Sequence, residues 1–142
     1  MKQPNRPTFF LDRSLGKQLI AAALRDKDLF VEVHDDHFPP DAKDEEWLAK
    51  IGDRGWIVLT KDRKFHNRVL EIAAIANSRV RVFKLTAANI QGQEMAAIFV
   101  KAISKIERVA AGNPAPFIAT VSRSGTVKIV LSARRLKKYK TR

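Results

Sequence analysis

A nearly continuous apolar run, Trp56-Ile57-Val58-Leu59-Thr60, is followed at once by four charged residues, Lys61-Asp62-Arg63-Lys64, and then by Phe65. Such a run is typical of a central strand that is buried on both faces of a parallel sheet. Asp62 therefore lies just past the carboxyl end of a predicted strand. In an open α/β sheet, side chains at this position face the crevice where ligands bind. This segment predicts both the class of the fold and the place of a site.

Two further aspartates hold comparable positions. Asp12 follows the apolar run Thr8-Phe9-Phe10-Leu11, and Asp44 opens an amphipathic helical segment that ends near Ile51. Because the ends of parallel strands share one edge of a sheet, we expect Asp12, Asp44 and Asp62 to gather there. Close carboxylates repel one another unless a cation compensates, and ligand sets made only of oxygen suit Mg²⁺ or Mn²⁺. The pattern predicts a divalent-metal site.

Each aspartate also has a purely structural interpretation. Asp12 is placed to cap a helix, Asp44 follows Asp41 at the spacing of a capping box, and Asp62 is placed to form an Asx-turn. Taken singly, these structural roles are the simpler explanation. The combination of three such positions at one sheet edge favours a functional site.

Positive charge accompanies the aspartates and is unevenly distributed. Residues 1–71 contain 13 Lys or Arg and 13 Asp or Glu, whereas residues 72–142 contain 14 Lys or Arg and only Glu94 and Glu107 as acids, so the second half carries the whole net charge of +12. A basic surface attracts phosphate backbones. We therefore predict a nucleic-acid partner, although charge alone leaves solubility as an alternative. Four cations lie beside the predicted carboxylates, where a phosphate substrate needs positive charge: Arg13, Lys17, Lys61 and Arg63.

Alternating strand and helix patterns predict one α/β domain over residues 1–142, with a mainly parallel central sheet flanked by helices. We expect strands at 8–11, 29–34, 56–60 and 80–85, helices from Ser14 and at 41–51, 66–77 and 89–111, and a hairpin at 117–121 and 127–131. The strand at 80–85 is expected to be the more exposed one. The core is predicted to span about 8–111, with a hairpin and basic tail at 112–142.

Several classes of protein are excluded or disfavoured by composition. The chain contains no cysteine, which excludes disulfides and thiolate metal sites. No apolar run approaches the roughly 20 residues needed to cross a bilayer, and the polar N-terminus lacks the apolar stretch of a signal peptide. We therefore expect a cytoplasmic protein without a membrane partner. The segment His34-Asp35-Asp36-His37 is interpreted as an exposed polar loop rather than a metal site.

The residues from Asp44 to Leu48, together with residues 56–65, resemble the second half of a PIN domain. In that family an aspartate opens a helix, a strand follows, and the strand ends in a Thr-x-Asp-x-x-Phe signature, matched here by Thr60, Asp62 and Phe65. Leu11-Asp12 is similar to the family's first strand and its leading aspartate. The resemblance covers about residues 8–85 and is closest to a short PIN-like branch related to VapC-type toxins.

The resemblance implies a PIN-like three-layer fold. The long helix and the β-hairpin toward the C-terminus are predicted from the residue pattern, and the hairpin and basic tail lie outside the family's core. The resemblance also implies an RNA endonuclease that uses Mg²⁺ or Mn²⁺, often as the toxin of a type II toxin–antitoxin pair with a cognate antitoxin protein. Asp12, Asp44 and Asp62 are the implied catalytic and metal-binding residues. The predicted long helix is apolar over more than one stripe, which leaves a homodimer contact open.

One departure from the family concerns a further acid. Longer PIN domains carry another carboxylate, usually a glutamate, on an early helix, and no residue in Ser14–Leu24 fits that role. Glu45 is the best substitute, although a helix turns it about 100° away from Asp44. Other candidates are Glu32, Asp35 and Asp36, and a site with three acids is a further alternative. The number of bound metals is therefore left open.

Two alternative functions remain at this point. The missing acid favours a catalytically silent PIN-like module that binds RNA or a protein partner. The segment Asp41-Ala42-Lys43 faintly suggests a restriction-type nuclease, but that motif needs a strand and here follows two prolines. We rank both below the metal-dependent ribonuclease.

Overall fold

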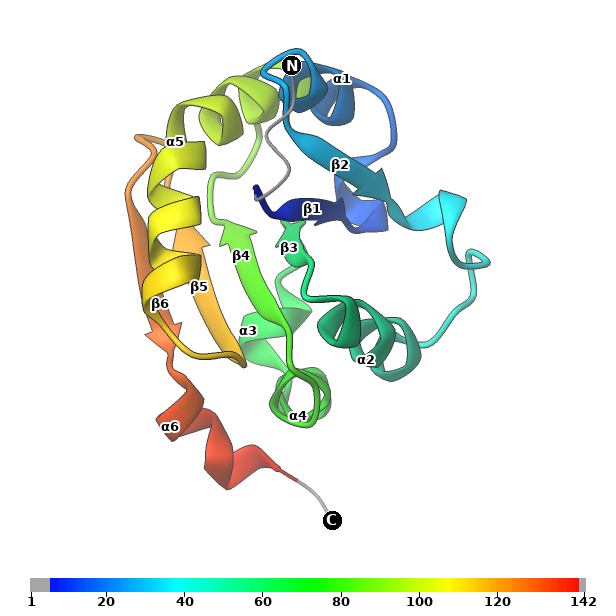
Figure 1. Ribbon diagram of the computed structural model, residues 1–142, viewed down its shortest axis with the longest axis vertical. Helices are drawn as coiled ribbons and strands as arrows, with labels where there is room; N and C mark the ends of the chain where they lie inside the picture. The colour runs from blue at the N-terminus through cyan, green and yellow to red at the C-terminus, as the bar shows by residue number, and fades with distance from the viewer. Residues whose placement is uncertain (1–5, 141–142) are drawn as a thin grey trace.

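Six strands form one sheet in the order β2-β1-β3-β4-β5-β6 in the computed structural model, which describes residues 6–140. The strands are β1 (Thr8–Leu11), β2 (Phe30–Val33), β3 (Ile57–Thr60), β4 (Arg81–Leu85), β5 (Phe117–Val121) and β6 (Val127–Leu131). Neighbouring strands are parallel except for β5 and β6, which form the antiparallel hairpin (Figure 1). The predicted α/β class with a mainly parallel central sheet is confirmed.

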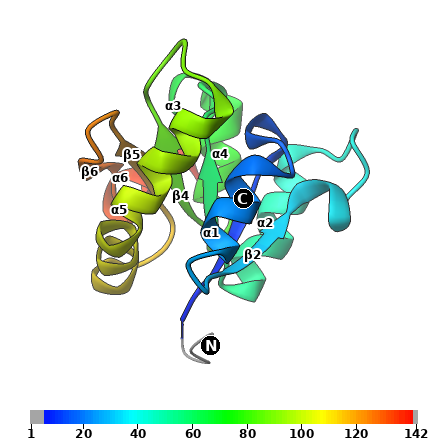
Figure 2. The same ribbon diagram turned by 90° about the horizontal axis from the view of Figure 1, so that it is seen from above.

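Helices cover both faces of this sheet. Their bounds are η1 (Arg13–Leu15), α1 (Leu19–Arg25), η2 (His34–Asp36), α2 (Asp44–Arg54), α3 (Lys64–Asn67), α4 (Val69–Ala76), α5 (Gly92–Gly112), α6 (Ala133–Leu136) and η3 (Lys137–Tyr139). The pair α1 and α5 packs together on one face, and α2, α4 and α6 lie on the other (Figures 1 and 2). The chain therefore has three layers.

Two hydrophobic cores, one on each face, explain why the central strands carry apolar residues on both faces of the sheet. Phe9 and Leu11 of β1 pack in the core under α1 and α5, whereas Phe10 packs in the core under α2 and α4. In β3, Val58 and Leu59 divide between the cores in the same way. This alternation follows from the two-residue period of a strand.

The parallel arrangement brings the carboxyl ends of β1, β2 and β3 to one edge. Leu11 is in register with Val33 of β2 and with Leu59 of β3, and the Asp12 amide donates to the Leu59 carbonyl at 3.2 Å. The residues that follow these strands are therefore neighbours, as the sequence predicted.

One strand differs from its sequence prediction. The segment 80–85 was predicted to be the more exposed strand because it contains Arg81 and Lys84, but β4 is almost wholly buried. The reason is β5, which pairs in parallel with the outer side of β4 and makes β4 an internal strand. The C-terminal hairpin is thus part of the central sheet.

Helix starts also differ from the predictions. The first α-helix begins at Leu19 rather than at Ser14. Gly16, directly after η1, has a φ of 73°, and this non-helical backbone conformation separates η1 from α1. The long helix begins at Gly92 with Gln91 as its N-cap residue, whereas the sequence indicated Asn89 as the N-cap; the φ of Asn89 is 58°, which differs from the extended conformation typical of an N-cap.

The predicted basic tail contains short helical segments as far as Tyr139, and Leu136 is buried against the core under α4. Residues 141–142 lie outside the described part of the chain. Within residues 6–140, every helix is too short or too polar to cross a membrane.

A close approach at Gly52 gives a test of the packing between α2 and the segment before β4. A Cβ at Gly52 would lie 2.8 Å from the backbone nitrogen of Arg79, whereas a Cβ at Gly112 would meet nothing within 4 Å. We expect Gly52→Ala to lower the free energy of unfolding by about 1–3 kcal/mol, because backbone must move. The control Gly112→Ala should cost nothing and gain up to about 1 kcal/mol. Urea denaturation of both variants measures this, and equal stabilities would contradict the packing.

Candidate active site

A cleft of about 410 Å³ lies at the carboxyl edge of the sheet between β1, β3 and α2. The three predicted aspartates, Asp12, Asp44 and Asp62, all line it, together with His34 and Lys64 among others. Asp12 follows β1, Asp44 is the first residue of α2, and Asp62 follows β3. The structure therefore brings together residues that are up to 50 positions apart in the sequence.

Asp12 is the most deeply buried of the three carboxylates, with 4% of its surface exposed. One oxygen accepts hydrogen bonds from the Ser14 amide, at 2.9 Å, and from the Ser14 hydroxyl, and the other accepts from the Thr60 hydroxyl. Burial raises the pKa of Asp12 to about 6, the hydrogen bonds lower it in part, and the charge of Asp62 raises it further. Asp12 is held in one orientation in a poorly solvated place.

Asp44 and Asp62 are joined by a lysine ammonium. Lys64 Nζ lies 2.7 Å from Asp44 Oδ2 and 3.3 Å from Asp62 Oδ2. The Trp47 indole N–H donates to Asp44 Oδ1 at 2.9 Å, and the Lys64 amide donates to Asp62 Oδ1 at 3.1 Å. Burial alone would lower the pKa of Lys64, but the hydrogen bonds and charges of the two carboxylates outweigh it and raise the pKa. The ammonium is thus charged and screens two of the three carboxylates from each other.

His34 also faces the cleft, which corrects the prediction of an exposed polar loop at residues 34–37. His34 is 3% exposed, and burial lowers its pKa. Its Nδ1 lies 3.5 Å from Asp35 Oδ1 and has no well-aligned hydrogen bond among the described residues. His37 is separate, because its Nε2 lies 2.6 Å from Glu32 Oε1. The histidine pair therefore does not form one site.

The remaining predicted site residues are divided among different surfaces. Arg13 lines the cleft, and its Nε lies 3.2 Å from Asp35 Oδ1. Lys17 lines a smaller hollow that Arg13 also borders. Lys61 and Arg63 line a separate pocket beside the cleft. Glu45 is exposed on α2 and is not one of the side chains that line the cleft.

The donor groups suit a hard divalent cation, but they are not arranged as a complete ligand set. Within residues 6–140, no three acidic, histidine or cysteine side chains are close enough together to hold a metal ion as they stand. The carboxylate oxygens of the cleft are nevertheless the ligands that Mg²⁺ and Mn²⁺ prefer. The Lys64 ammonium already lies where Asp44 and Asp62 require positive charge. In chemical type the oxygen donors of the cleft therefore fit such an ion, and the Lys64 ammonium contributes to their charge balance.

Sequence reasoning missed three residues of this site: Ser14, His34 and Lys64. Ser14 follows Asp12 by two positions, a spacing typical of Asx-turns, so a local signal existed. Lys64 stands two positions after Asp62, but its contact with Asp44 depends on how α2 packs. Thr60, the first residue of the Thr-x-Asp-x-x-Phe signature, donates a hydrogen bond to Asp12.

The raised pKa of Asp12 predicts how stability changes with pH. Between its usual value of 3.8 and about 6, the unfolded chain ionises this carboxyl while the folded chain resists ionisation, so the wild type loses stability as pH rises. Asp12→Asn removes this loss. In EDTA, the variant should therefore gain stability relative to wild type between about pH 4 and about pH 7, by at most about 3 kcal/mol. Urea denaturation at both pH values measures the unfolding free energy of the variant minus that of the wild type. A difference that stays constant or becomes less favourable to the variant as pH rises would contradict the assignment.

Comparison with known proteins agrees with this geometry. The family described as a PIN like domain matches residues 7–87, the segment that contains β1 to β4 and the three aspartates. The putative ribonuclease VapC45 of Mycobacterium tuberculosis (strain ATCC 25618 / H37Rv) is 30% identical over 125 residues, which cover 85% of this chain and 90% of that protein. No solved structure gives a significant match. The chain therefore belongs to the PIN-like domain family and is related to a VapC-type protein.

Proposed function

We propose that this protein is a metal-dependent endoribonuclease that hydrolyses phosphodiester bonds of RNA. The observation that carries the proposal is the convergence of Asp12, Asp44 and Asp62 on one cleft at the carboxyl edge of the sheet. The description of the relative VapC45 as a putative ribonuclease supports the same reaction and substrate class. Membership of the PIN-like family supports a nuclease built on these three aspartates.

Asp12, Asp44 and Asp62 would hold Mg²⁺ or Mn²⁺, directly or through water. The bound ion would lower the pKa of a water molecule, polarise the scissile phosphate and offset charge on the leaving oxygen. Ser14 and Thr60 fix the orientation of Asp12 through their hydrogen bonds. Glu45 is exposed outside the cleft, so it would need to turn inward to act as a ligand. The site needs no nucleophilic side chain.

The position of Lys64 favours a single divalent ion. The Lys64 ammonium lies 2.7 Å from a carboxylate oxygen of Asp44 and 3.3 Å from one of Asp62, and it balances their negative charge. A second divalent ion between these two carboxylates would be repelled by the ammonium. We infer that Lys64 takes the place of a second metal and holds Asp44 and Asp62 near their working positions before the first ion binds.

Substrate binding would depend on the basic side chains around the cleft. Arg13 and Lys17 border one side, and Lys61 and Arg63 border the other, so each pair is placed to contact phosphates. Such contacts position the substrate without reading its sequence. The affinity for RNA should therefore fall steeply as salt rises.

We further propose that the protein is the toxin of a type II toxin–antitoxin pair and acts on cytoplasmic RNA. The VapC-type relative supports this role. A cognate antitoxin would then be its protein partner. Coexpression with the product of the adjacent reading frame, followed by copurification, tests the pairing.

A second candidate function is a catalytically silent module that binds RNA or a protein partner. The observation that favours it is the Lys64 ammonium between two of the three carboxylates. Incubating a labelled RNA with the protein and Mn²⁺, with EDTA as the control, separates the two functions. Cleavage that requires Mn²⁺ excludes the silent module.

Asp62→Asn and Asp12→Asn should each reduce Mn²⁺-dependent cleavage by at least about a hundredfold, because each removes a charged oxygen ligand that the ion requires. Circular dichroism should remain that of the wild type. The matched control is Asp53→Asn, an exposed position on α2 outside the cleft, which should retain full activity. Undiminished cleavage by either cleft variant would exclude this site as the catalytic centre.

Lys64→Met should lower the free energy of unfolding of the metal-free protein by about 1 kcal/mol, because Asp44 and Asp62 lose their shared cation. Mn²⁺ should then stabilise the variant more than it stabilises the wild type. Thermal denaturation and calorimetric titration with Mn²⁺ measure the two effects, and the wild type should bind about one ion per chain.

Lys61→Met is the control for this comparison, since Lys61 is an exposed neighbour that lines the other pocket. It should leave the response to Mn²⁺ unchanged. If the wild type binds two ions, or if Lys64→Met responds to Mn²⁺ as the wild type does, Lys64 does not take the place of a metal.

A further inference from the structure

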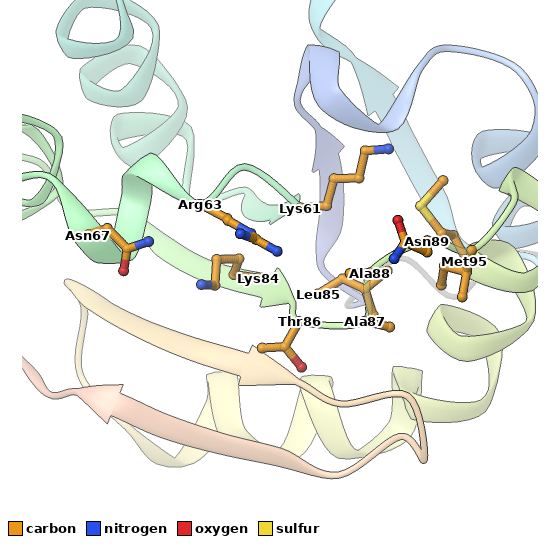
Figure 3. A pocket seen from close by; sticks show the side chains of 11 residues that line it. Lys61, Arg63, Asn67, Lys84, Leu85, Thr86, Ala87, Ala88, Asn89 and Met95 are labelled. Carbon is orange, nitrogen blue, oxygen red and sulfur yellow. The ribbon is translucent and has the colours of Figure 1, made fainter.

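A second pocket, of about 370 Å³, lies beside the catalytic cleft at the carboxyl ends of β3 and β4. Its wall contains Lys61 and Arg63 after β3, Asn67 on α3, and Lys84 and Thr86 at the end of β4 (Figure 3). The segment from Thr86 to Ile90 closes the side toward α5. Residues of β4, of helices α3 and α5 and of the loops after β3 and β4 therefore build it together.

The pocket is cationic and partly buried. Among the described residues that line it, three are cationic and none is acidic. Lys84 is only 6% exposed, and Figure 3 shows it beside Arg63. Burial lowers the pKa of Lys84, and the positive charge of Arg63 lowers it further. An anion bound between these two side chains would counter both effects, because it attracts both cations.

The chemistry of the lining indicates which part of a nucleic acid would bind. The lining contains ammonium, guanidinium, amide and hydroxyl groups, which are donors for phosphate oxygens. It contains no aromatic ring among the described residues, so it offers no surface on which a base would stack. The pocket is therefore suited to a phosphodiester rather than to a nucleobase.

Its position relates the pocket directly to the catalytic cleft. Lys84 of β4 is in register with Thr60 of β3, and Thr60 donates a hydrogen bond to Asp12. Neighbouring strands lie about 4.8 Å apart. Asp62 faces the cleft, while Lys61 and Arg63 on either side of it face the pocket. An RNA strand that crosses this edge of the sheet would thus pass directly from the cleft to the adjacent pocket.

We propose that this pocket, with Arg63 and Lys84 as its anchors, binds a phosphate of single-stranded RNA that neighbours the scissile phosphate. The inference rests on the proposed ribonuclease function, because it assigns the cleft to the scissile bond. The RNA then runs along the carboxyl edge of the sheet, across the ends of β3 and β4. The pocket positions the backbone and does not select a sequence.

The test measures the binding of a labelled oligouridylate by fluorescence anisotropy in EDTA, at several salt concentrations. Arg63→Gln and Lys84→Met should each weaken binding about tenfold. Each should also reduce the slope of log affinity against log salt by about 0.7, the value for one lost contact with a single strand. Arg108→Gln is the matched control, because Arg108 is exposed on α5 beside Glu107, which pairs with Arg6 before β1 at the opposite edge. It should leave affinity and slope unchanged.

Several outcomes decide the proposal. Unchanged binding and slope in Arg63→Gln overturn it, and this variant is informative even if Lys84→Met fails to fold, because Arg63 is exposed. If inorganic phosphate raises the melting temperature of the wild type but not of Arg63→Gln, while RNA binding is equal in both, the pocket binds small anions and the proposal falls.

Failure of this inference is distinguishable from failure of the proposed function. If the wild type cleaves RNA with Mn²⁺, Arg63→Gln should raise KM and leave kcat nearly unchanged, because the contact is made equally before and during the reaction. If the wild type does not cleave RNA, the proposed nuclease function is overturned. A reduced salt slope in the variants would then still support the phosphate-binding pocket.

Discussion

Repulsion among three carboxylates at one edge of the sheet is the constraint on which the rest of this structure depends. At Asp12 the repulsion is reduced because burial raises the pKa of the carboxyl to about 6, and hydrogen bonds fix its orientation. Between Asp44 and Asp62 the repulsion is reduced because both carboxylates pair with the Lys64 ammonium. The two arrangements differ: at Asp12 ionisation of the carboxyl is made unfavourable, whereas at Asp44 and Asp62 the negative charge is balanced by a cation. A divalent ion would relieve the cost at Asp12, which Lys64 does not contact in any described interaction.

The sheet topology explains why the C-terminal half belongs to the same functional edge. The hairpin of β5 and β6 extends the sheet beyond β4, so β4 becomes an internal strand and the Lys84 side chain is buried at its end. Without β5, β4 would be an edge strand of the parallel sheet. The excess positive charge of residues 72–142 is therefore not only a property of the tail, because part of it is built into the sheet beside the carboxylates.

The carboxylates and most strands were predictable because their signals are local. Asp12 and Asp62 directly follow apolar runs, and Asp44 opens an amphipathic helix, so short segments were sufficient. Lys64 and His34 were not, since their roles depend on how α2 and η2 pack against β1 and β3. The exposure of β4 was predicted wrongly for the same reason: its charged residues indicate solvent, but a strand from the far end of the chain covers it.

The four residues after β3 place opposite charges on two adjacent surfaces. Lys61 and Arg63 line the basic pocket, whereas Asp62 and Lys64 line the acidic cleft. A single tetrapeptide therefore lines two surfaces, and under the proposed function it would supply an anchor for substrate, a ligand for metal and a counter-charge. A one-residue insertion before Asp62 would exchange these surfaces: a carboxylate would enter the basic pocket, and a cation would replace Asp62 in the cleft. The spacing between the end of β3 and Asp62 is therefore constrained by charge placement as strongly as by the packing of the strand.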